Sequence, residues 1–233
     1  MINVYWSNSK FNFGDILTPH ILDYFTINYK MVSDPINADA MCIGSIIRRA
    51  TNNMIVLGSG TINSKHQLNS QADYRFVRGP LTRKHILDSG GKCPEIYGDP
   101  ALLLPLFCPE ETKEFDIGIT PHYVDFNLVK EKYPKYKIIQ LENKNPLEVA
   151  REISKCKKII SSSLHGIIAA HAYGIPAAWT KFSNNVKGDD IKFKDYYASI
   201  NLDAVISTVE NPNFSLGTLD LTPIKEEFYK LRT

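Results

Sequence analysis

Short apolar segments alternate with segments of helical pattern along most of this 233-residue sequence. The apolar segments rarely carry a polar residue at every second position, which is typical of strands that are covered on both faces. The segments between them have apolar residues at helical spacing, as with Ile21, Leu22 and Phe25 in the stretch 16–29. This alternation predicts an α/β fold in which helices cover both faces of parallel sheets.

The alternation breaks once and then restarts, which predicts two halves. Two prolines, Pro105 and Pro109, and an acidic pair interrupt it. We therefore predict a domain at residues 1–108 and a second at 109–233, with one continuous doubly wound sheet as the alternative. The predicted strands span residues 2–6, 40–44, 53–58, 75–79, 115–120, 136–141, 157–162 and 177–180. The predicted helices span residues 16–29, 80–91, 126–133, 146–156, 164–173 and 222–232, and the last can pack on either half.

Composition narrows the classes of function. The net charge of +2 argues against a nucleic-acid surface, although a local arginine cluster can still bind a small anion. The four cysteines form no CxxC pair, which indicates reduced thiols and no structural zinc site. The longest apolar run is far too short to cross a bilayer. We expect a cytoplasmic protein, and weak peripheral attachment to the inner face of a membrane stays open.

Ligands of open parallel sheets bind beyond the carboxyl ends of the strands, where helix amino ends favour anions. The first such turn is "NFGD", Asn12 to Asp15. Gly14 permits close approach of the backbone, and Asp15 is a candidate general base or a group that orients a substrate hydroxyl. The alternative is that Asp15 caps the helix that follows.

Two further turns offer weaker signals. The stretch "GSG", Gly58, Ser59 and Gly60, can line a phosphate or let another segment pass closely. It is not the GxSxG turn of a serine hydrolase. In "GDP", Asp99 either faces the proposed boundary between the halves or simply forms a turn.

Cationic residues stand at the start of the predicted helix 80–91. Arg78 ends a strand, and Thr82 and Arg83 lie in the first helical turn, where acidic residues are normally preferred. A cation there indicates a binding site for an anion, and the planar guanidinium of Arg78 suits a carboxylate or phosphate. The alternative is a salt bridge from Arg78 to Asp88 or Glu95.

The stretch "SSSLHG" carries the fullest anion-binding pattern. Ser162 and Ser163 end a strand, and a rigid apolar helix begins near Leu164. Free backbone N–H groups, two hydroxyls and the imidazole of His165 converge on its first turn, which also holds Gly166. We expect all five residues to contribute to substrate binding.

Five motifs together resemble the polysaccharide pyruvyl transferase family. They are "NFGD", "GSG", "VRGPLTRKHIL", "YGDPALLLP" and "SSSLHGIIAAHAYGIPA", in the family's order between about Asn12 and Pro176. The resemblance implies two Rossmann-like domains in the glycosyltransferase-B arrangement, with phosphoenolpyruvate bound in the cleft between them. It also implies transfer of pyruvate as a ketal onto a sugar of a capsule, an exopolysaccharide or a lipid-linked precursor, with release of phosphate.

The family's site residues carry over by position. Arg78 resembles the arginine that contacts phosphoenolpyruvate, and His165 with its neighbours resembles the donor-binding "LH" segment. Many members have an arginine just before that segment, where this chain has Ser163. The phosphate then depends more on hydroxyls, backbone amides and either Arg83 or Lys181.

We predict that His165, Asp15 and Arg78 carry the catalysis. Arg78 holds the donor carboxylate or phosphate, His165 acts as general acid or phosphate ligand, and Asp15 acts on the acceptor hydroxyl with Asp99 in reserve. Phosphoenolpyruvate serves as a substrate, and no cofactor or metal is expected. The alternatives are a nucleotide-sugar glycosyltransferase, a catalytically silent carbohydrate-binding protein of the same fold and, as a poor third, a serine hydrolase.

Overall fold

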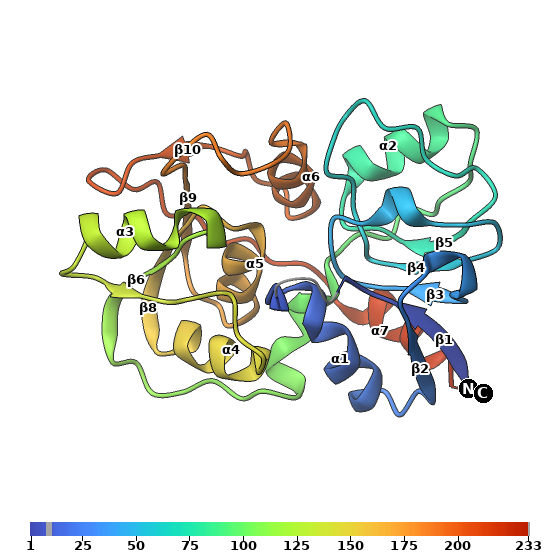
Figure 1. The fold of residues 1–233 in the computed structure, drawn as a ribbon, viewed down its shortest axis with the longest axis horizontal. Coiled ribbons are helices and arrows are strands. Elements are labelled where there is room, and N and C mark those ends of the chain that lie inside the picture. The colour runs from blue at the N-terminus through green and yellow to red at the C-terminus, as the bar shows by residue number, and fades with distance from the viewer. Residues whose placement is uncertain (8–10, 233) are drawn as a thin grey trace.

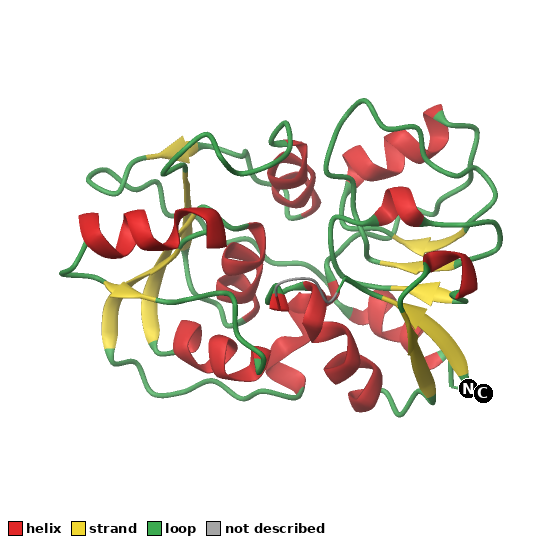
Figure 2. Ribbon diagram, viewed as in Figure 1, coloured by secondary structure: helices red, strands yellow, loops and turns green. Residues whose placement is uncertain are grey.

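The structure, a computed structural model, describes residues 1–7 and 11–232 and contains two parallel five-stranded sheets (Figures 1 and 2). The first sheet has the order β2-β1-β3-β4-β5, and the second has the order β10-β9-β8-β6-β7. The first consists of β1 (Ile2–Tyr5), β2 (Tyr29–Val32), β3 (Ala40–Met41), β4 (Ile55–Leu57) and β5 (Asp73–Phe76). The second consists of β6 (Phe115–Thr120), β7 (Lys137–Ile138), β8 (Cys156–Ser161), β9 (Ala177–Thr180) and β10 (Ile206–Ser207). The α/β prediction is confirmed, and the alternative of one continuous sheet is wrong.

The two sheets share one topology. In each, the first strand in chain order lies between the second and the third, so the connections reverse direction at that point. Such a reversal opens a crevice at the carboxyl ends of the first and third strands, where ligands of doubly wound folds bind. The fold therefore supplies two crevices, one at β1 and β3 and the other at β6 and β8.

Seven α-helices flank the sheets in the described part of the chain (Figure 1). They are α1 (Thr18–Tyr24), α2 (Pro80–Asp88), α3 (Phe126–Lys132), α4 (Pro146–Ser154), α5 (Leu164–Ala172), α6 (Ile191–Ser199) and α7 (Thr222–Tyr229). Short 3-10 turns add to them, and the longest, Pro100–Leu106, packs against α5. Apolar side chains of that turn, of α5 and of both sheets form one continuous hydrophobic cluster, so the halves share a core.

The chain departs from the predicted elements in three places. The predicted helix 16–29 ends at Tyr24 because Thr26 adopts a left-handed conformation with a φ of 56°, and the residues that follow form β2. Helix α6 has buried residues on all its faces and so shows no amphipathic period. Strand β10 has only two residues, too few for a recognisable pattern.

The C-terminal helix α7 returns to the first half. It contacts β4 and β5, and the ring of Phe228 stacks on Phe25 with centroids 4.9 Å apart. The two ends of the chain consequently lie near each other (Figure 1). No helix within residues 1–7 and 11–232 has the length and apolar character that a membrane crossing requires.

Candidate active site

A pocket of about 190 Å³ lies at the carboxyl ends of both sheets. Its lining comes from the segments that follow β1, β3 and β4 in the first half and β6, β8 and β9 in the second. These residues are Asn12, Asp15, Ser45, Ile46, Ile62, His122, Tyr123, Ser163, Leu164, His165, Lys187 and Lys192. Both crevices that the topology creates thus open into the same space.

A larger hollow of about 480 Å³ lies beside β7 and α4. Its charged side chains already pair with one another: Lys137 and Lys155 with Glu152, and Arg151 with Glu111. Because these ion pairs leave little charge for a ligand, the smaller pocket is the candidate active site.

Asp15 presents a buried carboxylate to the pocket. Its Oδ2 accepts a hydrogen bond of 3.0 Å from the Asn12 side chain. Gly44 makes room for it, since a Cβ there would lie 2.2 Å from Asp15 Oδ1. Burial raises the pKa of Asp15 to about 6, although His165 and Asn12 oppose the rise. Neither the 3-10 turn that Asp15 begins nor helix α1 has a side-chain cap, so the capping alternative is wrong.

His165 lies between two carboxylates in the first turn of α5. Its Nε2 is 3.5 Å from Asp99 Oδ2, and its positive charge, when present, acts on Asp15. Neither Nε2 nor Asp99 Oδ2 has a hydrogen-bond partner among the described residues, although both atoms are buried. Asp99 Oδ1 accepts from the backbone N–H of Ala101 at 3.0 Å. Asp99 therefore forms a turn and also places a negative charge beside the imidazole.

Gly14 fixes the position of the imidazole. A Cβ at Gly14 would lie only 2.0 Å from His165 Nδ1, so the backbone of the "NFGD" turn packs directly on the ring. We expect Gly14→Ala to displace the ring and to lower the rate of any reaction that uses the imidazole by about 10- to 100-fold, because a shift of about 1 Å at a reacting group has that effect. Steady-state kinetics beside a thermal unfolding curve would check this. An unchanged rate in the folded variant would contradict the packing argument.

Of the residues around the start of α5, Ser163 lines the pocket, whereas Ser162 and Gly166 support it. Ser163 lines the pocket, and its side chain makes no capping bond to the helix. The Ser162 hydroxyl accepts a hydrogen bond of 2.9 Å from the backbone N–H of His122. A Cβ at Gly166 would lie 2.3 Å from the hydroxyl of Thr120, so Gly166 lets α5 pack closely on β6. Ser162 and Gly166 thus support the pocket from behind.

The "GSG" turn also lies behind the pocket lining. Ser59 donates a hydrogen bond of 2.8 Å to the carbonyl of Gly44 and thereby joins the loops after β3 and β4. The glycine at position 60 packs against the guanidinium of Arg78, where a Cβ would lie 2.3 Å from Cζ. Gly58 has a φ of 85°, which favours glycine.

Arg78 is fully buried and faces an aspartate of the second half. Its Nε lies 3.1 Å from Asp195 Oδ2, and its other nitrogens donate to the Ser45 hydroxyl at 2.8 Å and the Thr61 carbonyl at 2.7 Å. Thr82 donates to the same carboxylate from its backbone N–H at 2.8 Å and from its hydroxyl at 2.6 Å. The anion expected at the start of α2 is therefore Asp195, which belongs to α6 of this chain.

Arg83 and Lys181, the other cations that the sequence offers for the phosphate, do not line the pocket. Arg83 lies 3.2 Å from Glu95 and donates to the carbonyl of Cys93, so it is outside the pocket. Lys181 pairs with Asp190 at 2.5 Å and does not line the pocket either. The salt-bridge partner of Arg78 is neither Asp88 nor Glu95.

Sequence reasoning missed Lys192, which lines the pocket from α6 and is only 8% exposed. Its neighbours in the stretch 187–195 are mostly charged, a pattern that is typical of a solvated face. It also missed Ser45, His122 and Lys187, whereas Tyr123 is among the aromatic residues that the sequence offers for stacking on a sugar ring. In residues 1–7 and 11–232 no three His, Cys, Asp or Glu side chains group as a metal site.

Comparison with known proteins identifies the family. The polysaccharide pyruvyl transferase family profile matches residues 4–184. An uncharacterized protein of Acanthamoeba polyphaga mimivirus is 34% identical over 73% of this chain and 61% of its own length. The succinoglycan biosynthesis protein ExoV of Rhizobium meliloti is 26% identical over 82% of this chain and 62% of its own length. The chain thus spans about three fifths of these relatives, and it belongs to the polysaccharide pyruvyl transferase family.

Proposed function

We propose that the chain transfers the pyruvyl group of phosphoenolpyruvate to a sugar of a cell-surface polysaccharide or of its precursor. The observation that carries the proposal is the placement of His165 between Asp15 and Asp99 at the amino end of α5, in a pocket lined by both halves. The succinoglycan role in the name of one relative supports a polysaccharide acceptor. The two sheets would then be the two Rossmann-like domains of a glycosyltransferase-B arrangement, with the pocket in their cleft.

The size and charge of the pocket favour a small anion as donor. A volume of about 190 Å³ is below the range of about 300–1,000 Å³ that larger ligands occupy. Phosphoenolpyruvate carries a carboxylate and a phosphate, and the uncapped amino end of α5 attracts either group. A nucleoside diphosphate sugar is much larger, so the glycosyltransferase alternative fits the pocket less well.

The proposed roles follow the balance of the reaction. Two acceptor hydroxyls form C–O bonds to C2 of phosphoenolpyruvate, and the bond from C2 to the phosphate oxygen breaks. The hydroxyls release two protons, of which one ends on the methylene carbon and the other leaves with phosphate. His165 delivers the first proton, with the charge of Asp99 beside it, and Asp15 accepts a proton from the attacking hydroxyl.

In this proposal Arg78 supports the donor site indirectly. Its guanidinium donates to the Ser45 hydroxyl, and Ser45 lines the pocket. Arg78 is therefore a positioning residue that orients Ser45 and holds α6, while direct contact with the donor falls to side chains of the lining.

The raised pKa of Asp15 predicts an acid limb in the pH profile of transfer. A base must be ionised, so the rate should fall as the pH drops below about 6, by a factor of ten per unit. Donor phosphate titrates near the same pH, with a pKa of about 6. Asp15→Asn is therefore the control, because its residual rate keeps only the donor's titration. Identical slopes in wild type and variant would remove Asp15 as the base.

Transfer itself can be tested with phosphoenolpyruvate labelled with carbon-13 at its methylene carbon. A panel of microbial polysaccharides, succinoglycan included, would be treated with mild acid to free ketal positions. We expect phosphate release that matches a new labelled methyl signal of a ketal. Phosphate release without that signal would indicate simple hydrolysis, and neither product with any acceptor would contradict the proposal.

A further inference from the structure

The ammonium group of Lys192 has no anionic partner among the described residues. The Lys192 residue lines the pocket and is 8% exposed, and within the described part of the chain its Nζ makes no hydrogen bond and no ion pair. Its recorded contact is with the ring of Phe193, whose centroid is 5.3 Å away. A buried charge is costly unless an opposite charge or hydrogen bonds offset it. An anion bound in the pocket would supply that compensation.

The surroundings of Lys192 disfavour its charged form when no ligand is bound. Burial and the charge of Arg78 lower the pKa of Lys192 to about 8, while Asp190 and Asp15 oppose the change. Asp190 is already paired with Lys181, and Asp15 is bonded to Asn12. Neither carboxylate therefore forms an ion pair with Lys192.

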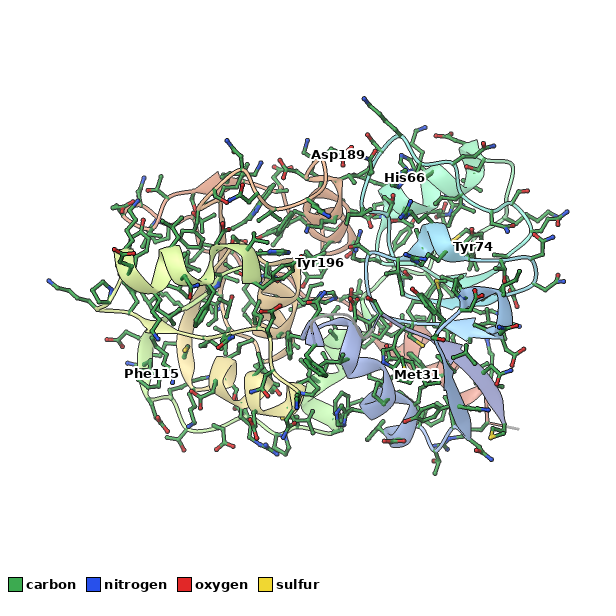
Figure 3. The ribbon with its side chains drawn as sticks, in the orientation of Figure 1. Met31, His66, Tyr74, Phe115, Asp189 and Tyr196 are labelled. Carbon is green, nitrogen blue, oxygen red and sulfur yellow. The ribbon has the colours of Figure 1, made fainter. Side chains whose placement is uncertain are left out.

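Helix α6 is anchored on two sides, which holds Lys192 in place. Asp195 binds Arg78 and Thr82 of the first half. The Tyr196 hydroxyl lies 2.9 Å from Nδ1 of His171 on α5, and Figure 3 shows Tyr196 at the centre of the molecule. Burial lowers the pKa of His171 to about 4, so it stays neutral and this contact persists at neutral pH.

A further hydrogen bond links the two halves just before α6 begins. Ser64 of the first half donates to Asp189 of the second, at 2.9 Å from its backbone N–H. Figure 3 labels Asp189 at the top of the molecule, where the two halves meet. The segment that leads into α6 is thus tied to the first half, and Lys192 is positioned by fixed contacts rather than by its own flexible stem.

We infer that Lys192 and the amino end of α5 form a phosphate-binding site for the donor, in which the Lys192 ammonium pairs with the phosphate. Both elements line the same pocket, and the α5 amino end lacks a side-chain cap. The lining holds two lysines, of which Lys187 is exposed and Lys192 is buried, so Lys192 is the one whose charge an anion would offset. The inference rests on the proposed function for the identity of the donor, whereas the phosphate site stands on the geometry.

The test is calorimetric titration of the intact chain with phosphoenolpyruvate and with inorganic phosphate, between pH 7 and pH 9.5. Wild-type affinity for phosphoenolpyruvate should fall about tenfold per pH unit above about 8, as free Lys192 loses its charge. Lys192→Met should bind about 10- to 150-fold more weakly at pH 7, with no further loss at high pH. Lys192→Arg should restore binding without the alkaline decline, because a guanidinium stays charged there.

The outcomes separate this inference from the proposed function. Unchanged binding by Lys192→Met, or an alkaline decline that persists in Lys192→Arg, would overturn the role of Lys192 and leave the transferase proposal standing. If wild type binds phosphate with the expected decline but not phosphoenolpyruvate, the phosphate site stands and the donor is wrong. Binding of neither anion would overturn both. Thermal unfolding of each variant confirms that the fold is kept.

Discussion

Replacing Arg78 with alanine is expected to lower the free energy of unfolding by about 3–5 kcal/mol, since the change leaves Asp195 buried without its cationic partner. Both side chains of this pair are fully buried. The pair joins β5 and α2 of the first half to α6 of the second. A loss of this size is a large part of the stability of most domains.

Urea denaturation of wild type and Arg78→Ala would measure this difference, and Arg83→Ala is the matched control. The salt bridge of Arg83 with Glu95 is partly exposed, with side-chain exposures of 24% and 73%, so its loss should cost at most about 1 kcal/mol. Equal stability of wild type and Arg78→Ala, together with lost donor binding, would show that the guanidinium contacts the donor instead.

Replacing His165 with alanine is expected to lower transfer by about 10²- to 10⁴-fold, the range that a positioned acid or base contributes. The fold should persist, because the variant removes a ring at the pocket wall and leaves the apolar body of α5 intact. Initial rates of phosphate release, with unfolding curves as a check on the fold, would measure the effect.

Asp99→Asn is the matched variant for this prediction. Its remaining side-chain oxygen can still accept from the backbone N–H of Ala101, but the negative charge beside the imidazole is lost. We expect a rate between those of wild type and His165→Ala. A fully active His165→Ala protein would remove the histidine from the mechanism.

Regular, well-buried elements could be predicted from the sequence. The strands at 115–120 and 177–180 match β6 and β9, and the helix at 164–173 matches α5 to within one residue. In these segments the spacing of apolar residues and the positions of proline and glycine indicate the same element. Helix α6 escaped prediction because nearly all its residues are buried, and β2 because it begins only a few residues after α1 ends.

Part of the site followed from topology. Asp15 and His165 follow β1 and β8, and Asp99 follows Tyr97, which forms an isolated parallel bridge with Val77. Parallel pairing brings the segments after such strands to one edge. The pairing of Arg78 with Asp195 could not be predicted in this way, because 117 positions separate the two residues and α6 was unknown. The arginine indeed marked an anion-binding helix start, but the anion came from the chain itself. Lys192 belongs to the same helix, so its place in the pocket could not be predicted either.

The most direct test of the central claim is calorimetric titration of wild-type protein with phosphoenolpyruvate at pH 7, with uridine diphosphate as the comparison. We expect saturable binding of phosphoenolpyruvate at one site per chain, reduced by competing inorganic phosphate, and no binding of the nucleotide. Binding of the nucleotide alone would point to a glycosyltransferase, and binding of neither would contradict a donor site in this pocket.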